Sequence, residues 1–495
     1  MNDLLYGFSI ALTWQNLLAA FGGALIGTAV GVLPGIGPSS AMAILLPATL
    51  GLEPATSLIM LAGIFYGSQY GGSTTAILLN MPGESTALIT CRDGYQMALK
   101  GRAGAALAIS GVGSFIAGTA GVVGLTFATT AIAEAALAFG PPEYFCLALL
   151  GLAVLSRLST AAPWKNALLL ALGALLATVG QDPLTGEGRF TLGITELMAG
   201  ISLVPVLMGV YGVSEVLAVI QRSAGFPKMI EVKFRELFPT AREWRASAGP
   251  IARGTLLGFP LGLIPGPAAL ISTYLSYALE KRVSKHPEQF GQGAIEGVAG
   301  PESANNAATS GTLAPLLALG LPFTGATALL LAGMTIHGIQ PGPLLVTQHP
   351  EIFWGVIASM YIGNVALLIL NVPLVGLWVS LLRVPQALLV CLILVFTVVG
   401  AYSVRNSVAD IYVLLGSGVI GYLLVALKFD MAPLILGMVL GPVMEENLRR
   451  SLFQSDGNLL IFVTSRLSIG MMTMLVLVLL GPPCYRLVRD RMPQS

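Results

Sequence analysis

Residues 31–37 read Gly-Val-Leu-Pro-Gly-Ile-Gly, and a similar pattern returns 231 residues later as Gly-Leu-Ile-Pro-Gly-Pro-Ala at residues 262–268. In both places a proline beside a glycine interrupts an apolar run. Proline removes a backbone donor and glycine allows backbone angles that other residues avoid, so each segment predicts a break in a helix. The fold follows from these two breaks and from the apolar segments around them.

The composition indicates a membrane protein. Hydrophobic residues make up 55% of the 495 positions, charged residues only 10%, and the mean hydropathy is +0.82. A soluble domain carries about 25% charged residues. At roughly 20 residues per span, the chain has room for about ten to twelve transmembrane helices in the lipid bilayer. We expect an all-α polytopic membrane protein, and the net charge of +1 gives no reason to expect nucleic acid as a partner.

The basic residues predict a topology. Short loops rich in Lys and Arg stay cytoplasmic, which places Arg92–Arg102, the polar interval 221–253, Lys281–Lys285 and the tail Arg486–Arg491 on that side. Only 27 residues separate Arg253 from Lys281, although both are expected to be cytoplasmic. Residues 254–279 are therefore predicted to form a re-entrant hairpin with its tip at 265–267, covered by protein or lining a watery cavity.

A second pair of segments extends the repeat. Residues 70–83 (Tyr-Gly-Gly-Ser-Thr-Thr-Ala-Ile-Leu-Leu-Asn-Met-Pro-Gly) are matched by 310–322 (Ser-Gly-Thr-Leu-Ala-Pro-Leu-Leu-Ala-Leu-Gly-Leu-Pro), at an offset of 240. We infer a first membrane half at 1–222, a basic cytoplasmic connector at 223–253 and a second membrane half at 254–495. Each half contains one re-entrant or broken-helix hairpin, and the odd number of spans between the repeats favours an inverted over a parallel two-fold arrangement.

The breaks also predict a binding site. An interrupted helix leaves backbone N–H groups unpaired and carries partial positive charge at its N-terminus, so it can bind an anion without Lys or Arg. Interrupted segments at matching places in two halves point to a transporter binding site. A single Ser or Thr in a membrane helix often only bonds back to its own turn, so the cluster carries the prediction. The candidate substrate-binding residues are Pro34, Gly35, Gly37, Ser39, Ser40, Gly71, Gly72, Ser73, Thr74, Thr75, Asn80, Pro265, Gly266, Asn305, Asn306, Thr309 and Ser310.

One acidic residue lies beside the second group of polar residues. Charged side chains inside apolar segments are costly and usually functional, which makes Glu302 the acidic candidate for coupling a cation, together with Asn305. No catalytic residue, metal site or cofactor is expected. An ATP-driven pump would need a Gly-Lys pair in a P-loop, and the chain has none. For an intramembrane serine protease, Ser417 has no histidine after it. A passive channel stays open, although paired breaks suit alternating access better.

The chain resembles the large membrane subunit of the tripartite tricarboxylate transporters, the TctA family. The resemblance rests on residues 33–38, residues 70–83, Glu302 with 305–307, and residues 337–343. It implies a multi-pass protein of the bacterial inner (plasma) membrane that works with a small membrane subunit of about four helices and a periplasmic substrate-binding protein. It also implies uptake of a small carboxylate such as citrate, driven by a gradient of Na⁺ or H⁺. The alternative is a passive organic-anion channel, or a secondary transporter that acts without partner subunits. Where the family commonly has glycine after the proline of the second segment, this chain has Phe323.

Overall fold

The computed structural model of the protein describes residues 2–33, 36–158, 161–182, 185–221, 234–381 and 386–489. The first half contains eight long or medium helices followed by short elements. Their bounds are α1 (Asn2–Ala11), α2 (Trp14–Gly31), α3 (Pro38–Leu45), η1 (Leu46–Thr49), α4 (Pro54–Leu79), η2 (Ser85–Ala87), α5 (Leu88–Leu99), α6 (Ala103–Ala136), α7 (Pro141–Leu158), α8 (Pro163–Ala177), β1 (Gly180–Gln181), β2 (Gly188–Arg189), η3 (Thr195–Ala199), α9 (Leu203–Leu207), the π-helix η4 (Met208–Val213) and α10 (Ser214–Gln221).

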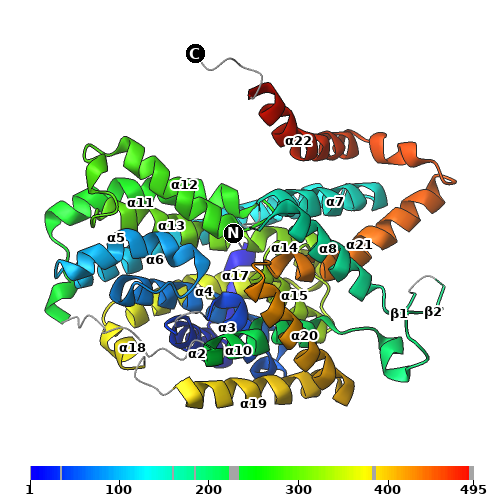
Figure 1. Ribbon diagram of the computed structural model, residues 1–495, viewed down its shortest axis with the longest axis horizontal. Helices are drawn as coiled ribbons and strands as arrows, with labels where there is room; N and C mark the ends of the chain where they lie inside the picture. The colour runs from blue at the N-terminus through cyan, green and yellow to red at the C-terminus, as the bar shows by residue number, and fades with distance from the viewer. Residues whose placement is uncertain are drawn as a thin grey trace.

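The second half is helical throughout its described part. Its elements are η5 (Phe234–Leu237), α11 (Ala241–Gly262), α12 (Ala268–Val283), η6 (Pro287–Gln289), α13 (Glu296–Gly311), α14 (Leu313–Leu319), α15 (Gly325–Ile336), α16 (Leu345–Gln348), α17 (Pro350–Asn371), α18 (Val375–Leu381), α19 (Gln386–Arg405), α20 (Val408–Ala426), α21 (Ala432–Gln454), η7 (Leu459–Val463) and α22 (Arg466–Arg489). Figure 1 shows α11, α12 and α13 side by side, while α22 lies at the edge of the molecule, where it packs on α7.

The prediction of an all-α polytopic membrane protein is confirmed. Among the described residues, β1 and β2 form a two-stranded antiparallel sheet in which Gly180 pairs with Arg189. Four helices there are long and apolar enough to cross a membrane, or five if the bent pair α1–α2 makes one span. Further apolar helices are shorter, at Pro163–Ala177, Gly325–Ile336, Val390–Arg405 and Arg466–Leu480. Several of the apolar stretches from which ten to twelve spans were predicted are therefore built as short or broken helices.

The predicted re-entrant hairpin is present in the second half. Helix α11 ends at Gly262, residues 263–267 form the tip, and α12 begins at Ala268 and returns along α11. Arg253 in α11 pairs with Glu280 in α12, which fixes the two arms side by side in opposite directions. In the first half, α2 ends at Gly31 and α3 begins at Pro38, so the chain breaks in the matching place.

The helix packing repeats with the same two offsets as the sequence. A Cβ atom on Gly27 of α2 would lie 2.5 Å from the carbonyl oxygen of Ile64 in α4. A Cβ atom on Gly258 of α11 would lie 2.3 Å from the carbonyl oxygen of Ala304 in α13. The equivalent approaches one turn away pair residues 23 with 60 and 31 with 68 in the first half, and 254 with 300 and 262 with 308 in the second. Small residues at four-residue spacing let membrane helices approach backbone to backbone, and both halves use them in the same positions.

The two halves are inverted. Helices α4 and α13 are equivalent in the repeat and contact each other through three pairs of polar side chains. Along α4 the residues in these pairs are Tyr66, Gln69 and Ser73, and their partners along α13 are Ser310, Asn305 and Glu302. Because the numbers rise on one helix and fall on the other, the equivalent helices run antiparallel, as an inverted repeat requires.

Candidate substrate-binding site

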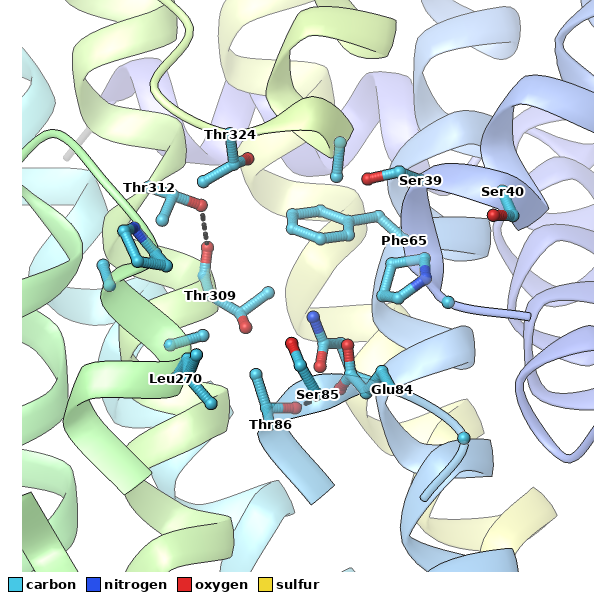
Figure 2. Close-up of a pocket in the computed structure, with 18 of the residues that line it drawn as sticks. Ser39, Ser40, Phe65, Glu84, Ser85, Thr86, Leu270, Thr309, Thr312 and Thr324 are labelled. Atoms are coloured by element: carbon cyan, nitrogen blue, oxygen red, sulfur yellow. Dashed lines mark hydrogen bonds between the residues drawn. The ribbon is translucent and has the colours of Figure 1, made fainter. Parts of the chain in front are cut away.

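A cavity of about 330 Å³ lies where the two breaks meet. Its wall comes from the start of α3 in the first half, the start of α12 in the second, the middle of α4 and α13, and the segment 83–86 after α4. Figure 2 shows these elements surrounding the space from different sides. The lining residues are Gly37, Pro38, Ser39, Ser40, Phe65, Gln69, Gly83, Glu84, Ser85, Thr86, Tyr211, Pro267, Ala268, Ala269, Leu270, Thr309, Thr312, Thr324 and Ala326.

Two helix N-termini line this cavity. Helix α3 begins at Pro38 with Gly37 as its N-cap, and α12 begins at Ala268 with Pro267 as its N-cap. The backbone N–H groups of a first helical turn have no partner within the helix, and the aligned peptide dipoles add partial positive charge there. None of the described residues that line the cavity is Lys, Arg or His. Backbone groups therefore supply the positive potential of the cavity wall.

Hydroxyl groups add neutral donors and acceptors to the wall. Ser39 on α3 turns its oxygen into the space, and Thr309, Thr312 and Thr324 lie opposite it (Figure 2). The Thr312 hydroxyl donates to the Thr309 carbonyl oxygen at 2.8 Å, and the Thr309 hydroxyl donates to the Asn305 carbonyl oxygen at 2.9 Å. This set of groups suits the oxygens of a small carboxylate.

Glu84 is an acidic side chain on the cavity wall that the sequence reasoning missed. Its carboxylate accepts a hydrogen bond from Thr86 at 2.5 Å. The Gln69 amide, with its nitrogen turned toward residue 84, donates to the same carboxylate and lies 3.2 Å from Asn305 Nδ2. Gly72 leaves room for it, since a Cβ there would lie 3.5 Å from Glu84 Cγ. The available signal was a charged residue directly after the Asn-Met-Pro-Gly break at 80–83.

Glu302 lies deeper, behind the cavity wall. It is 2% exposed and accepts hydrogen bonds from Ser73, at 2.6 Å, and from Thr90. The amide of Asn306 donates to the Glu302 carbonyl oxygen at 3.0 Å and to Ser114 at 2.7 Å. Glu302 thus joins α13 to α4 and α5 through hydroxyl groups.

The predicted site residues fall into three groups. Gly37, Ser39, Ser40 and Thr309 line the cavity, and Gly266 lines a second space next to it. Asn305 and Gly72 lie directly behind Glu84 and Gln69, and Ser73 binds Glu302. Other predicted residues are placed in helix contacts or at a helix end, and a list gives them: Gly71 packs on α2, Thr74 and Thr75 are buried in α4, Ser310 accepts from Tyr66, Asn306 bonds Ser114, Pro265 is near Gly151, and Asn80 is the exposed C-cap of α4 with φ +55°. Pro34 and Gly35 lie outside the described residues.

A second space of about 500 Å³ adjoins the cavity and shares Ser39, Tyr211, Pro267 and Thr324 with it. The ring of Phe323 lines this outer space and is 3% exposed. The side where the family resemblance predicts glycine is therefore narrowed by an aromatic ring. Lys428 and Asp430 also line the outer space.

Comparisons with known proteins agree with one family. Residues 17–436 match the tripartite tricarboxylate transporter TctA family. The chain is 47% identical over 500 residues, 99% of its length and 98% of the relative's, to an Agrobacterium vitis protein named as an uncharacterized 52.8 kDa protein in the TAR-I ttuC' 3' region. A second Agrobacterium vitis protein, named as an uncharacterized protein in the TAR-II ttuC' 3' region, is 46% identical over 236 residues, which cover 47% of this chain and 98% of that protein. No solved structure matches the chain. The match across most of the chain shows that it belongs to the tripartite tricarboxylate transporter TctA family.

Proposed function

We propose that this protein is the large transmembrane subunit of a secondary transporter that imports small carboxylates across the bacterial inner membrane. The observation that carries the proposal is the meeting of two helix N-termini, α3 and α12, at one hydroxyl-lined cavity. Such termini bind anions through backbone N–H groups. Family membership supports a transporter rather than an enzyme.

In this mechanism the carboxylate oxygens accept hydrogen bonds from the first turns of α3 and α12. The hydroxyls of Ser39 and Thr309 hold the rest of the molecule. Each hairpin comes from one half of an inverted repeat, so rocking one half against the other opens the cavity to one side of the membrane and then to the other. The cavity residues stay in place while access changes.

The partners follow from the family. A periplasmic binding protein hands the carboxylate to the cavity, and a small membrane subunit of about four helices completes the complex. A gradient of Na⁺ or H⁺ drives accumulation, and Glu302 with Asn305 are the cation-coupling candidates. The membrane-facing apolar side chains of α19 and α20 are consistent with contact to lipid or to this second subunit.

The test is uptake by the whole complex reconstituted in lipid vesicles. Labelled lactate, succinate and citrate serve as mono-, di- and tricarboxylate probes, each with and without an inward gradient of Na⁺ or H⁺. We expect accumulation of at least one probe above its external concentration, and only with a gradient. Uptake that stops at equal concentrations on both sides under every gradient would contradict secondary transport and indicate a passive anion channel.

A further inference from the structure

The cavity has a charge conflict that the proposed function leaves open. Its two helix N-termini favour an anion, yet Glu84 places a carboxylate on the same wall. Two negative groups in one small cavity repel each other, because the protein interior screens charge far less than water does. A carboxylate substrate can therefore share this space with Glu84 only if the charge of Glu84 is compensated.

No basic side chain provides that compensation among the described residues of the wall. The groups that face Glu84 come from four elements: Gln69 in α4, Thr86 in η2, Asn305 in α13 and the Gly37 backbone before α3. The nearest titratable side chain is a second acid, Glu302 on α13, which interacts electrostatically with Glu84. Tyr211 lines the cavity as well, and Lys428 and Asp430 lie further out.

Unused oxygen atoms lie next to Glu84. The side-chain oxygen of Asn305 has no hydrogen-bond partner, although the residue is only 2% exposed. Tyr70, 3% exposed, also has a hydroxyl without a partner and lies close enough to interact with Glu302. Buried polar atoms are almost always paired. Carboxylate, amide and hydroxyl oxygens are the groups that hold a small hard cation, or that accept and relay a proton.

We propose that Glu84 is the residue that binds the coupling cation, a proton or Na⁺, and that the carboxylate substrate occupies the cavity only when this cation is bound. Glu302 lies behind it as a positioning residue, held by Ser73 and Thr90, and keeps the potential at Glu84 negative enough to attract a cation. The inference rests on the proposed function and specifies its coupling site.

This arrangement couples the two fluxes by binding energy alone. A cation at Glu84 raises the affinity for the carboxylate, and by thermodynamic linkage the carboxylate raises the affinity for the cation by the same factor. An empty cavity and a doubly occupied cavity are both favoured over a cavity holding only the anion. Symport follows because the singly occupied anion state is avoided.

The test compares two kinds of transport in Glu84→Gln, whose neutral amide has nearly the shape of glutamate. The reconstituted complex is assayed with the labelled carboxylate that the wild-type complex transports best. One assay measures accumulation driven by a pH gradient at equal Na⁺, or by a Na⁺ gradient at equal pH. The other measures exchange at equal concentrations of substrate and cation on both sides. The gradient that drives the wild-type complex identifies the cation.

We expect Glu84→Gln to lose gradient-driven accumulation by at least tenfold while exchange continues. Its substrate binding should no longer depend on pH or Na⁺. The matched control is Glu134→Gln, an exposed glutamate near the end of α6, which should behave as wild type. Unchanged gradient-driven accumulation in Glu84→Gln would overturn the inference, and so would complete loss of substrate binding by a variant that still purifies as a single folded species. A wild-type complex that accumulates nothing under any gradient would instead refute the proposed function.

Discussion

Arg253 in α11 binds the carboxylate of Glu280 in α12 through two parallel hydrogen bonds, with Nε 2.8 Å from Oε1 and Nη2 2.5 Å from Oε2. The Glu280 side chain is 2% exposed, whereas that of Arg253 is 39% exposed. The pair joins the two arms of the re-entrant hairpin at the end away from its tip. The place of that tip in the cavity wall therefore depends on a contact about twenty residues of chain away.

Replacing Arg253 should loosen the hairpin. Arg253→Met leaves a buried carboxylate without its donors, and hydrogen bonds to charged groups contribute about 1.5–3 kcal/mol. We expect a lower unfolding temperature in detergent, with Arg253→Lys in between, because lysine keeps the charge and loses the planar fork. The control is Arg450→Met, whose partner Glu446 is 41% exposed, and such surface pairs contribute about 1 kcal/mol or less. Equal losses in the two methionine variants would show that the hairpin does not depend on this pair.

The glycines of α2 should differ sharply in their tolerance of alanine. Gly27→Ala would place a methyl group 2.5 Å from the Ile64 carbonyl oxygen, where only backbone movement can relieve the overlap. Overpacking of this kind costs about 1–3 kcal/mol. Gly22→Ala, on the same helix, meets nothing within 4 Å and should be neutral or stabilising. Unfolding temperatures in detergent measure the difference, and an unaffected Gly27→Ala protein would argue against close packing of α2 and α4.

The hairpin of the second half could be predicted because its signals are local. Basic residues on both sides of a short apolar segment, with Pro265-Gly266-Pro267 in its middle, leave little choice of path. The repeat was visible for the same reason, and the structure reproduces its offsets in helix contacts. The glycines of 70–83 were harder to interpret, since a glycine that admits a ligand and one that admits another helix look alike in a sequence. Gly71 turns out to serve the second purpose.

The site was only partly predictable because it depends on contacts between distant segments. Ser39 and Thr309 were named from their place beside a break, and both line the cavity. Glu84 was missed because its side chain reaches the cavity only after the chain turns back past α4. Glu302 was named for its charge, but its hydroxyl partners Ser73 and Thr90 come from helices more than 200 residues earlier, a pairing that no local pattern reveals.

The start of α11 should make stability depend on acid pH. Partial burial raises the pKa of Glu243, but hydrogen bonds from Arg102 and Thr240 lower it more, so the pKa lies below its ordinary value of 4.5. Because the folded pKa is the lower one, the stabilisation is complete above about pH 4.5 and is lost as the pH falls through the folded value. We expect wild type to exceed Glu243→Gln by about 1 kcal/mol or less at pH 7, with the difference vanishing in acid. Unfolding temperatures from pH 7 to pH 3 measure this, and a difference that does not change with pH would contradict the assignment.

The two halves should contribute separately to substrate affinity. Ser39 on α3 and Thr309 on α13 place hydroxyls on opposite sides of the cavity (Figure 2). Ser39→Ala and Thr309→Val each remove one hydrogen bond to a charged ligand, and a loss of about 1.4 kcal/mol corresponds to a tenfold change in affinity. We expect KM for uptake to rise about tenfold or more in each variant, with larger effects when both are combined. Thr335→Val, at the exposed end of α15, removes a hydroxyl that bonds only back to its own helix, at 2.9 Å from the Leu331 carbonyl oxygen, and should leave KM unchanged. If only one of the two cavity variants weakened uptake, the substrate would be held by a single half, and the symmetric site between the two hairpin tips would be wrong.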